Sequence, residues 1–377
     1  MQIPFHKPLY DHLDEEALLG AIRSGKIVGD GELTRAASEQ LAAMLGIRHA
    51  LLTTSCTHAL ELAMMVLRLK PGDEVIVPSF TFVSTTNCIL RAGGTVVFAD
   101  ILPDTLTIDP RDMEARITPA TRALLPVVYA GVAPQMDRIL EIARRHSLVV
   151  IEDAAQGVGA FFRGRPVGTI GDMGCFSFHE TKNYSTGEGG AFVTSNEEFL
   201  QRAEIIREKG TNRKQFLQGL VDKYTWVDVG SSFLPPDTVG AMLLSQLAKR
   251  DAIQATRKAI FERYNEEFAP LASRGLLILP TLPPETATNH HIYHVLLNDA
   301  ATRNRAIAFF RSRGITTTFH YLPLHLSPVG RTLGYSEGDF PVTESVSERL
   351  LRLPIYPALT REEQTCVIAT MKEFLAP

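Results

Sequence analysis

Between about residue 49 and residue 200, short apolar runs rich in β-branched residues alternate with segments of helical periodicity, and this alternation restricts the fold most strongly. Such βαβ units predict a mostly parallel sheet with helices on both faces, a doubly wound α/β fold. The predicted strands are 49–53, 74–77, 95–99, 123–128, 148–152, 175–178 and 191–194. The predicted helices between them are 57–69, 84–91, 136–146 and 196–207.

The chain has 377 residues, more than a single core usually accommodates, so two domains are expected. A helix predicted over 32–45 precedes the first strand, and a long helix predicted over 243–268 leads to a smaller α/β unit. That unit continues with a helix at 301–313, a strand at 316–321 and a last helix at 361–374. We therefore expect a large domain over residues 1–245 and a smaller domain over residues 246–377.

Composition and charge narrow the class of partner. The formal net charge is −4 and the isoelectric point is about 6.3. Nucleic acids and anionic membranes bind a basic face, so neither is expected as a partner. The four cysteines show no CxxC spacing, so neither a disulfide framework nor a zinc site is expected. The N-terminus lacks a signal-peptide core, and no apolar run has the length of a membrane span. These features predict a soluble, cytoplasmic protein without a metal.

Polar residues follow the predicted strands at the edge where ligands bind in doubly wound sheets. Ser55, Cys56 and Thr57 stand at a predicted helix N-terminus, where free backbone amides and hydroxyls can hold a phosphate. Ser and Thr are also common as ordinary helix caps. After the next strand, Phe80 or Phe82 is placed to lie flat against a planar ring, although an aromatic residue there more often packs in the core.

An acidic pair and a later lysine suggest a cofactor. Glu152 and Asp153 end a predicted strand, Gln156 follows, and the run at 174–183 carries Lys182. Pyridoxal phosphate needs a carboxylate for its ring nitrogen and an amine for its aldehyde. Without a cofactor, the acid could instead cap a helix or form an ion pair within the protein, and a lysine is usually a solvated surface residue. The hypothesis therefore depends on the phosphate site, the aromatic residue, the acid and the lysine occurring together in this order.

With these motifs the chain resembles the sugar-nucleotide aminotransferases of the DegT family, which have the aspartate-aminotransferase fold (fold type I of the pyridoxal-phosphate enzymes). The resemblance covers nearly the whole chain. Its longest runs are PGDEVIVPSFTFVST at 71–85, EDAAQG at 152–157, CFSFHETKNY at 175–184, AEIIREKGTNR at 203–213 and FHYLPLH at 319–325. It implies a large cofactor-binding domain, a smaller C-terminal α/β domain, and a homodimer with active sites at the subunit interface.

The resemblance also implies roles for the cofactor residues. Lys182 would bond to the cofactor aldehyde and carry protons, and Asp153 would bind the ring nitrogen. Gln156 would contact the ring hydroxyl, and Phe82 would stack on the ring. The residues implied for the phosphate are Cys56, Thr57 and Ser177. Much of the family adds an asparagine from the neighbouring subunit, and Ser232 stands in its place here.

The residues implied for the substrate are Lys209, Arg213, Tyr224, Trp226, His320, Tyr321 and His325. The first four belong to a basic, aromatic segment suited to gripping a diphosphate and stacking on a base. The alternative for this segment is a solvated loop at a dimer interface. The last three lie where the family lines its sugar pocket, although a histidine is more often structural than catalytic. His179 is a pocket residue without an assigned role.

The resemblance implies a reaction in two halves. Glutamate would convert pyridoxal 5′-phosphate to pyridoxamine phosphate, which would then aminate C4 of dTDP-4-keto-6-deoxyglucose. The product would be a dTDP-4-amino-4,6-dideoxyhexose of galactose or glucose configuration. Family members in which histidine replaces the lysine are dehydratases, so Lys182 indicates an aminotransferase. Three alternatives remain: a 3-keto sugar substrate, a UDP- or GDP-sugar, and a regulator that keeps the fold without catalysis.

Overall fold

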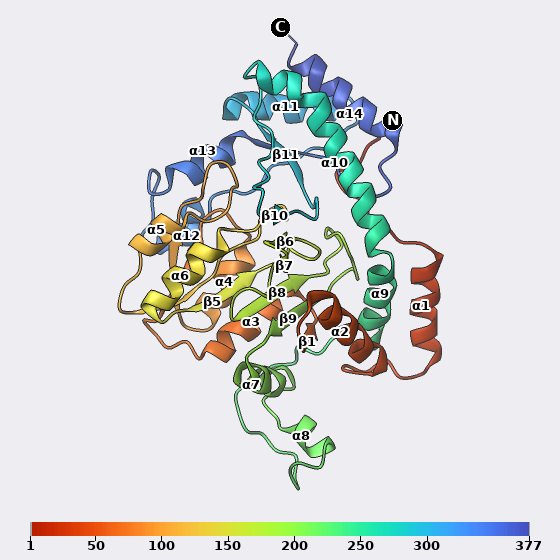
Figure 1. Ribbon diagram of the computed structural model, residues 1–377, viewed down its shortest axis with the longest axis vertical. Coiled ribbons are helices and arrows are strands. Elements are labelled where there is room, and N and C mark those ends of the chain that lie inside the picture. The colour runs from red at the N-terminus through yellow and green to blue at the C-terminus, as the bar shows by residue number, and fades with distance from the viewer. Residues whose placement is uncertain (1, 377) are drawn as a thin grey trace.

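The computed structural model describes residues 2–376 and is built around one large sheet (Figure 1). Its strands lie in the order β1 (Ala50–Thr53), β9 (Gly190–Thr194), β8 (Met173–Ser177), β5 (Val149–Asp153), β4 (Thr121–Leu124), β2 (Glu74–Pro78) and β3 (Thr95–Ala99). β9 is antiparallel to both of its neighbours, and the pairs from β8 to β3 are parallel. The predicted α/β fold with a mostly parallel sheet is confirmed, and the strand ends differ by a few residues.

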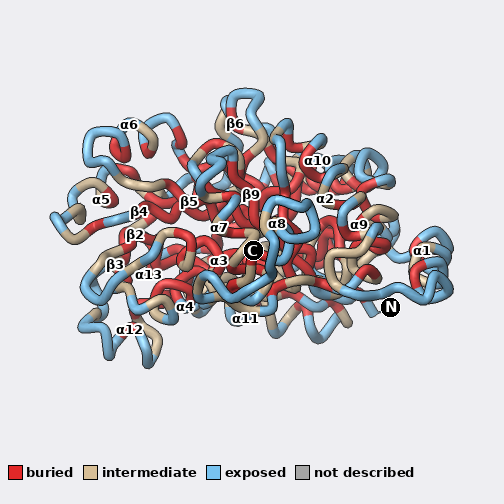
Figure 2. Tube along the Cα trace, turned by 90° about the horizontal axis from the view of Figure 1, so that it is seen from below, coloured by how far each residue is buried: buried red, intermediate tan, exposed pale blue. Residues whose placement is uncertain are grey.

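Neighbouring side chains of the buried strands enter two cores on opposite faces of the sheet, because successive side chains of a strand alternate. Leu52 and Val150 belong to one core and their neighbours Leu51 and Ile151 to the other. The helices that pack into the first core are α2 (Glu32–Leu45), α6 (Met136–His146) and α9 (Asp237–Ala248). Those of the second core are α3 (Cys56–Leu67), α4 (Val83–Arg91) and α7 (Glu197–Arg207). Burial is concentrated along the strands, with exposed turns around them (Figure 2).

Smaller elements surround this sheet. α1 (His12–Arg23) packs on α9, and α5 (Pro110–Ala115) packs on α6. A three-stranded sheet is made of β10 (Thr286–Ala287), β6 (Phe161–Phe162) and β7 (Arg165–Pro166). The segment 208–232, called here the α8 projection after its helix α8 (Arg213–Leu217), extends away from the rest of the molecule below α7 (Figure 1).

The C-terminal part has a core of its own, which contains Phe261, Tyr293, Phe310, Leu351 and Met371. Its two-stranded antiparallel sheet consists of β11 (Tyr293–Leu296) and β12 (Leu350–Leu353). The helices packed in this core are α10 (Arg250–Ser273), α11 (Ala300–Ser312) and α14 (Arg361–Phe374). The remaining helices are η1 (Leu324–Leu326), α12 (Pro328–Thr332) and α13 (Pro341–Arg349). The domain boundary after residue 245 stays a prediction.

Two predicted elements are wrong in detail. The helix predicted over 243–268 is two helices, α9 and α10, which meet at Lys249. The Lys249 ammonium pairs with Asp11 at 3.1 Å and with Asp14, so this junction is fixed to the start of α1. The strand predicted over 316–321 is reduced to a single bridge between Thr318 and Arg352, and the chain beyond it bonds to the end of β2, where the Leu324 N–H donates to the Ser79 carbonyl oxygen at 3.1 Å. Within residues 2–376, no helix is long and apolar enough to cross a membrane.

Candidate active site

A cavity of about 340 Å³ lies at the carboxyl ends of the parallel strands. β5 ends at Asp153, β8 ends at Ser177, and the loop from β8 to β9 carries Lys182. The C-terminal part adds residues 320, 321 and 352 to the wall. The residues implied by the family resemblance that line this cavity are Cys56, Thr57, Phe82, Asp153, Gln156, Ser177, Lys182, His320 and Tyr321, and His179, which had no assigned role, lines it too.

Lys182 is held by its backbone while its amine stays free. Its N–H donates to the carbonyl oxygen of His179 at 2.9 Å, and its Nζ bonds to no residue among 2–376. Burial lowers the pKa of Lys182; the nearby Cys56 and Asp153 oppose this shift and Arg352 adds to it. A lysine of lowered pKa is neutral more often near pH 7, and only a neutral amine is a nucleophile or a base.

Asp153 is buried and lines the cavity. Its Oδ2 accepts from Oγ1 of Thr85 at 2.7 Å, and its Oδ1 accepts from the N–H of Ala155 at 3.1 Å. Burial raises the pKa of Asp153, and these two donors and the Lys182 charge only partly offset it. A cation bound beside Asp153 would therefore stabilise its ionised form.

Glu152, the other acid of the pair, has a different role. It is fully buried, and its two oxygens accept three backbone N–H groups, from Gly168 at 2.7 Å, Ile170 at 2.6 Å and Gly171 at 2.7 Å. Its carboxylate is thus occupied in holding the loop before β8, and it does not line the cavity. Asp153 alone of the two remains for a ligand.

The N-terminus of α3 has the features expected of an anion site. The helix is capped by Ser55, whose Oγ accepts from the N–H of His58 at 3.1 Å. The N–H groups of Cys56 and Thr57 have no acceptor among residues 2–376, and the Thr57 hydroxyl lies 2.8 Å from that of Ser84. Free amides at a helix N-terminus, with hydroxyls beside them, favour phosphate.

Glycine at position 190 allows this helix end to approach the sheet. A Cβ on Gly190 would stand 2.4 Å from the backbone nitrogen of Cys56, which is closer than real Cβ atoms come to backbone. The first residue of β9 is therefore limited to glycine by the packing of α3. The same contact sets the depth of the predicted phosphate site, since Cys56 is the first residue of the helix.

Gln156, Tyr321 and Phe82 complete the wall. Gln156 accepts from the N–H of Ala130 at 2.7 Å and donates to the hydroxyl of Tyr321 at 3.0 Å, so its amide is fixed in orientation. Phe82 immediately precedes α4, lines the cavity and is 57% exposed. Its face is therefore available to a flat ligand, and the ring contacts implied for Phe82 and Gln156 stay predictions.

Several cavity residues were missed by the reasoning from sequence. They are Phe5, His6, Ser84, Thr85, His291 and Arg352. Ser84 and Thr85 follow Phe82 by two and three residues, a proximity that the sequence did contain. Arg352 interrupts the apolar run Leu-Leu-Arg-Leu-Pro-Ile at 350–355, and a charge within a buried strand was the available signal. Phe5, His6 and His291 reach the cavity through tertiary packing alone.

Six of the residues implied by the resemblance do not line this chain's cavity, and five of them share one segment. Lys209, Arg213, Tyr224, Trp226 and Ser232 belong to the α8 projection. Ser232 is joined to Glu208 in an isolated bridge at the base of the projection. None of the five lines the cavity of its own chain, and the projection extends away from the rest of the molecule (Figure 1).

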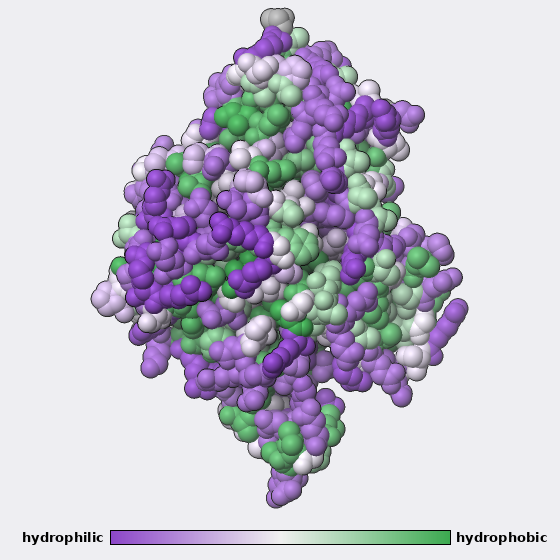
Figure 3. Space-filling model, in the orientation of Figure 1, coloured by the Kyte–Doolittle hydropathy of each residue, from purple (hydrophilic) through white to green (hydrophobic). Residues whose placement is uncertain are grey.

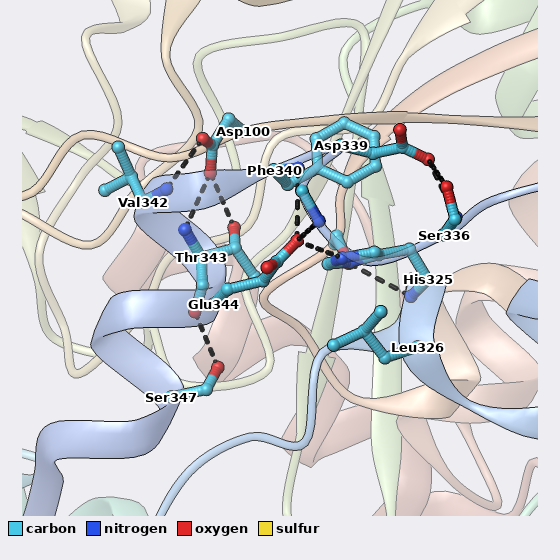
Figure 4. Close-up of polar contacts among 12 residues, drawn as sticks. Asp100, His325, Leu326, Ser336, Asp339, Phe340, Val342, Thr343, Glu344 and Ser347 are labelled. Carbon is cyan, nitrogen blue, oxygen red and sulfur yellow. Dashed lines mark hydrogen bonds and ion pairs between the residues drawn. The ribbon is translucent and has the colours of Figure 1, made fainter. Parts of the chain in front are cut away.

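His325 is corrected from a substrate residue to a structural one. It is fully buried, and its Nδ1 lies 2.7 Å from Oγ of Ser79 while its Nε2 lies 2.9 Å from Oε1 of Glu344. Figure 4 shows the ring between η1 and the N-terminal turn of α13, where Asp100 accepts from the N–H groups of residues 342 and 343. Both ring nitrogens are occupied, so nothing is left for a substrate in this chain.

The residues present fit pyridoxal phosphate. Asp153 supplies a buried carboxylate for a ring cation, Lys182 an unpaired amine, and the start of α3 free N–H groups for a phosphate. Each group faces the same cavity, and each is left without a full set of partners by the protein. The set contains the functional groups that the cofactor requires.

Comparison with known proteins identifies the family. The model of the DegT/DnrJ/EryC1/StrS aminotransferase family matches residues 9–372, and the chain belongs to this family. MJ1066, an uncharacterised protein of Methanocaldococcus jannaschii, is 38% identical over 88% of this chain and 87% of its own. The spore coat polysaccharide biosynthesis protein SpsC of Bacillus subtilis is 33% identical over 99% of this chain and 97% of its own.

A solved structure has the same fold. Spr1654 from Streptococcus pneumoniae, a candidate sugar aminotransferase solved in its pyridoxal-phosphate form, has a TM-score of 0.93 at 27% identity. The match covers 100% of this chain and 99% of that one. The family and the fold type that the motifs indicated are both confirmed.

Proposed function

We propose that this chain is a pyridoxal-phosphate-dependent aminotransferase that transfers the amino group of glutamate to C4 of dTDP-4-keto-6-deoxyglucose. The product is a dTDP-4-amino-4,6-dideoxyhexose of galactose or glucose configuration. The observation that carries the proposal is the meeting of the Lys182 amine, the Asp153 carboxylate and the α3 N-terminus in one cavity. The aminotransferase family match and the solved pyridoxal-phosphate and pyridoxamine-phosphate forms of Spr1654 support it.

The residues divide the work of holding the cofactor. The N–H groups of Cys56 and Thr57, with the hydroxyl of Ser177, bind the phosphate, and Phe82 covers the ring. Gln156 presents its amide to the ring hydroxyl. Asp153 holds the proton on the ring nitrogen, since a carboxylate beside it favours the cation. When bound, the cofactor supplies an electron-withdrawing ring that stabilises negative charge on the carbon that loses a proton.

Lys182 moves the proton. With the cofactor bound, the Lys182 Nζ would be the group that accepts the proton of the donor's α-carbon and carries it to the cofactor. A base works best when its pKa is near the working pH, and burial shifts the pKa of Lys182 in that direction. His320 and Tyr321 stand at the same wall and are placed to contact the sugar.

A second copy of the chain completes the substrate site in this proposal. The α8 projection carries exposed apolar side chains, among them Leu217 (69% exposed), Leu220 (70%) and Trp226 (74%), and Figure 3 shows hydrophobic residues on it. Burying them against a partner would be favourable. In that homodimer Ser232 reaches the partner's phosphate site, and Lys209, Arg213, Tyr224 and Trp226 grip the diphosphate and the base.

The test is an assay across keto-sugar nucleotides with glutamate as donor. dTDP-4-keto-6-deoxyglucose should be aminated fastest, with the product mass and its ring proton couplings giving the position and configuration of the amine. Faster amination of a 3-keto sugar, or of a UDP- or GDP-linked sugar, would replace the proposed substrate. A purified protein with no cofactor absorption and no turnover on any of them would indicate a regulator instead.

A further inference from the structure

His291 is a buried histidine of the cavity wall that has no part in the proposed function. It lines the cavity of about 340 Å³ together with Lys182. Its backbone is held on both sides, because its N–H donates to Oδ1 of Asn289 at 3.2 Å and its carbonyl oxygen accepts from Nη2 of Arg257 at 2.6 Å. The preceding residue, His290, has a left-handed backbone with φ 51°, which is uncommon outside glycine and persists only where the surroundings hold it. The ring of His291 therefore has a fixed place at the cavity.

The hydrogen bonds of Asn183 determine which ring nitrogen of His291 carries the hydrogen. The Asn183 amide nitrogen donates to the carbonyl oxygen of Asn289 at 2.8 Å, and a backbone carbonyl can only accept. Its Oδ1 consequently faces Nδ1 of His291, at 2.8 Å, and an amide oxygen can also only accept. The hydrogen is thus on Nδ1, and Nε2 is left as a bare acceptor.

His291 acts as an acceptor and not as a base. Burial lowers the pKa of its ring well below the usual range, and the charges of Lys182 and Arg257 act in the same direction. Arg352 and His6 add to this effect. A ring that takes up no proton near pH 7 can still accept a hydrogen bond. Nε2 therefore needs a donor from the cavity side.

A second, smaller cavity is lined by both His291 and Lys182. The volume open to the centre of a water molecule is about 10 Å³ there, and one water needs about 10–15 Å³ and two to four polar partners. No direct hydrogen bond joins Nζ of Lys182 to Nε2 of His291, and neither atom bonds to another residue among 2–376. Ser177 and Tyr184 add hydroxyl groups to the same walls. The small cavity thus has the size and the polar groups to hold one water.

We propose that this small cavity binds one water molecule, which accepts a hydrogen bond from Nζ of Lys182 and donates one to Nε2 of His291, an inference that rests on the proposed role of Lys182. His291 is then a positioning residue. Through the water it stabilises the Lys182 ammonium and holds the free amine in one place between accepting and delivering its proton. Asn183, the residue after Lys182, keeps the ring in the tautomer that this bridge requires.

The test compares His291→Leu, which removes the acceptor, with His291→Gln, whose amide oxygen can accept in its place. His290→Gln is the matched control, since His290 is buried in the same segment but lines neither cavity. The rate at which the full-length, cofactor-free protein bonds pyridoxal phosphate is followed by cofactor absorbance as a function of pH. Only a neutral amine reacts, so the midpoint of this profile reports the pKa of Lys182.

His291→Leu should lower this midpoint by about 1–2 pH units, because the ammonium loses its bridge to an acceptor. His291→Gln should recover most of this shift, and His290→Gln should match the wild type. The other groups that act on the pKa of Lys182 are Cys56, Asp153 and Arg352, and no variant changes them.

A crystal structure of the wild type with pyridoxamine phosphate tests the water itself, even where His291→Leu does not fold. It should show a water within about 3.2 Å of both nitrogens. An unchanged midpoint in His291→Leu, an equal shift in His290→Gln, or a wild-type structure without this water would overturn the inference alone. A wild-type protein that does not bond pyridoxal phosphate would contradict the proposed function itself.

Discussion

The charged residues of the cavity acquire their chemistry from what surrounds each of them. Glu152 and Asp153 are adjacent in sequence, yet three backbone donors occupy the first, while the second receives one hydroxyl and one N–H and faces the cavity. Burial raises the pKa of Asp153 in the cofactor-free chain, so below its folded pKa the buried acid is protonated and above it the bare carboxylate opposes folding.

Asp153→Asn should therefore have opposite effects on two properties. In the cofactor-free protein, the free energy of unfolding near pH 7 should rise, because the buried carboxylate is gone. In the holoenzyme, cofactor affinity should fall, and the glutamate half reaction should slow by about 10²- to 10⁴-fold, because nothing holds the ring proton. Urea unfolding and stopped-flow absorbance measure the two effects, with the exposed Asp251→Asn as control. Wild-type half-reaction rates in this variant would show that Asp153 does not hold the ring nitrogen.

At the scale of elements, the contact of β9 with the start of α3 can be tested through Gly190. Gly190→Ala places a Cβ against the Cys56 nitrogen, so we expect a loss of stability of about 1–3 kcal/mol and weaker cofactor binding. Gly20→Ala is the matched control, since nothing lies within 4 Å of a Cβ there and the residue is inside α1. It should stabilise the protein by up to about 1 kcal/mol. Equal melting and cofactor titration curves for the two variants would contradict this account of the helix end.

Two buried histidines, His290 and His294, predict that acid lowers the free energy of unfolding. Burial lowers the pKa of His290 to about 4 and that of His294 to about 3. Above pH 6.5 these rings are neutral in both states; below it, the unfolded chain takes up protons that the folded chain does not. As the pH is lowered from about 6.5 to 4, the free energy of unfolding should thus fall. Each histidine contributes a decrease on the order of 1.4 kcal/mol per pH unit. His290→Gln should flatten this slope and the exposed His49→Gln should not. An unchanged slope in His290→Gln would contradict it.

For the whole molecule, the α8 projection predicts self-association. Trp226 is the single tryptophan of the sequence and is 74% exposed in the isolated chain, so its fluorescence reports on this surface. We expect a dimer mass by sedimentation, with emission that shifts to the red on dilution. Leu220→Asp should weaken the dimer at least about tenfold, because it would bury an unpaired charge. Leu282→Asp, an exposed position elsewhere, should leave the mass unchanged. A wild-type monomer with unshifted emission would refute the shared site.

The sequence predicted the parts of the site that strand ends determine, and missed those that depend on tertiary packing. Asp153, Ser177 and Lys182 follow strands of one parallel sheet, so their meeting could be anticipated. Arg352 belongs to β12 of the C-terminal part, and only the folded chain brings it to the same cavity as Lys182. The segment 316–321 has the composition of a strand, but in the folded chain it pairs only at Thr318 and otherwise connects the C-terminal part to the cavity wall.

The central claim is that Lys182, acting with a cofactor held by Asp153 and α3, takes an amino group from an amino acid before any sugar binds. The most direct measurement is the 2-oxoglutarate released from excess glutamate by the holoenzyme without a keto sugar. We predict a burst of about one equivalent per chain, which then stops, and none from Lys182→Ala. No burst from the wild type, release that requires the sugar, or an equal burst from Lys182→Ala would contradict the claim.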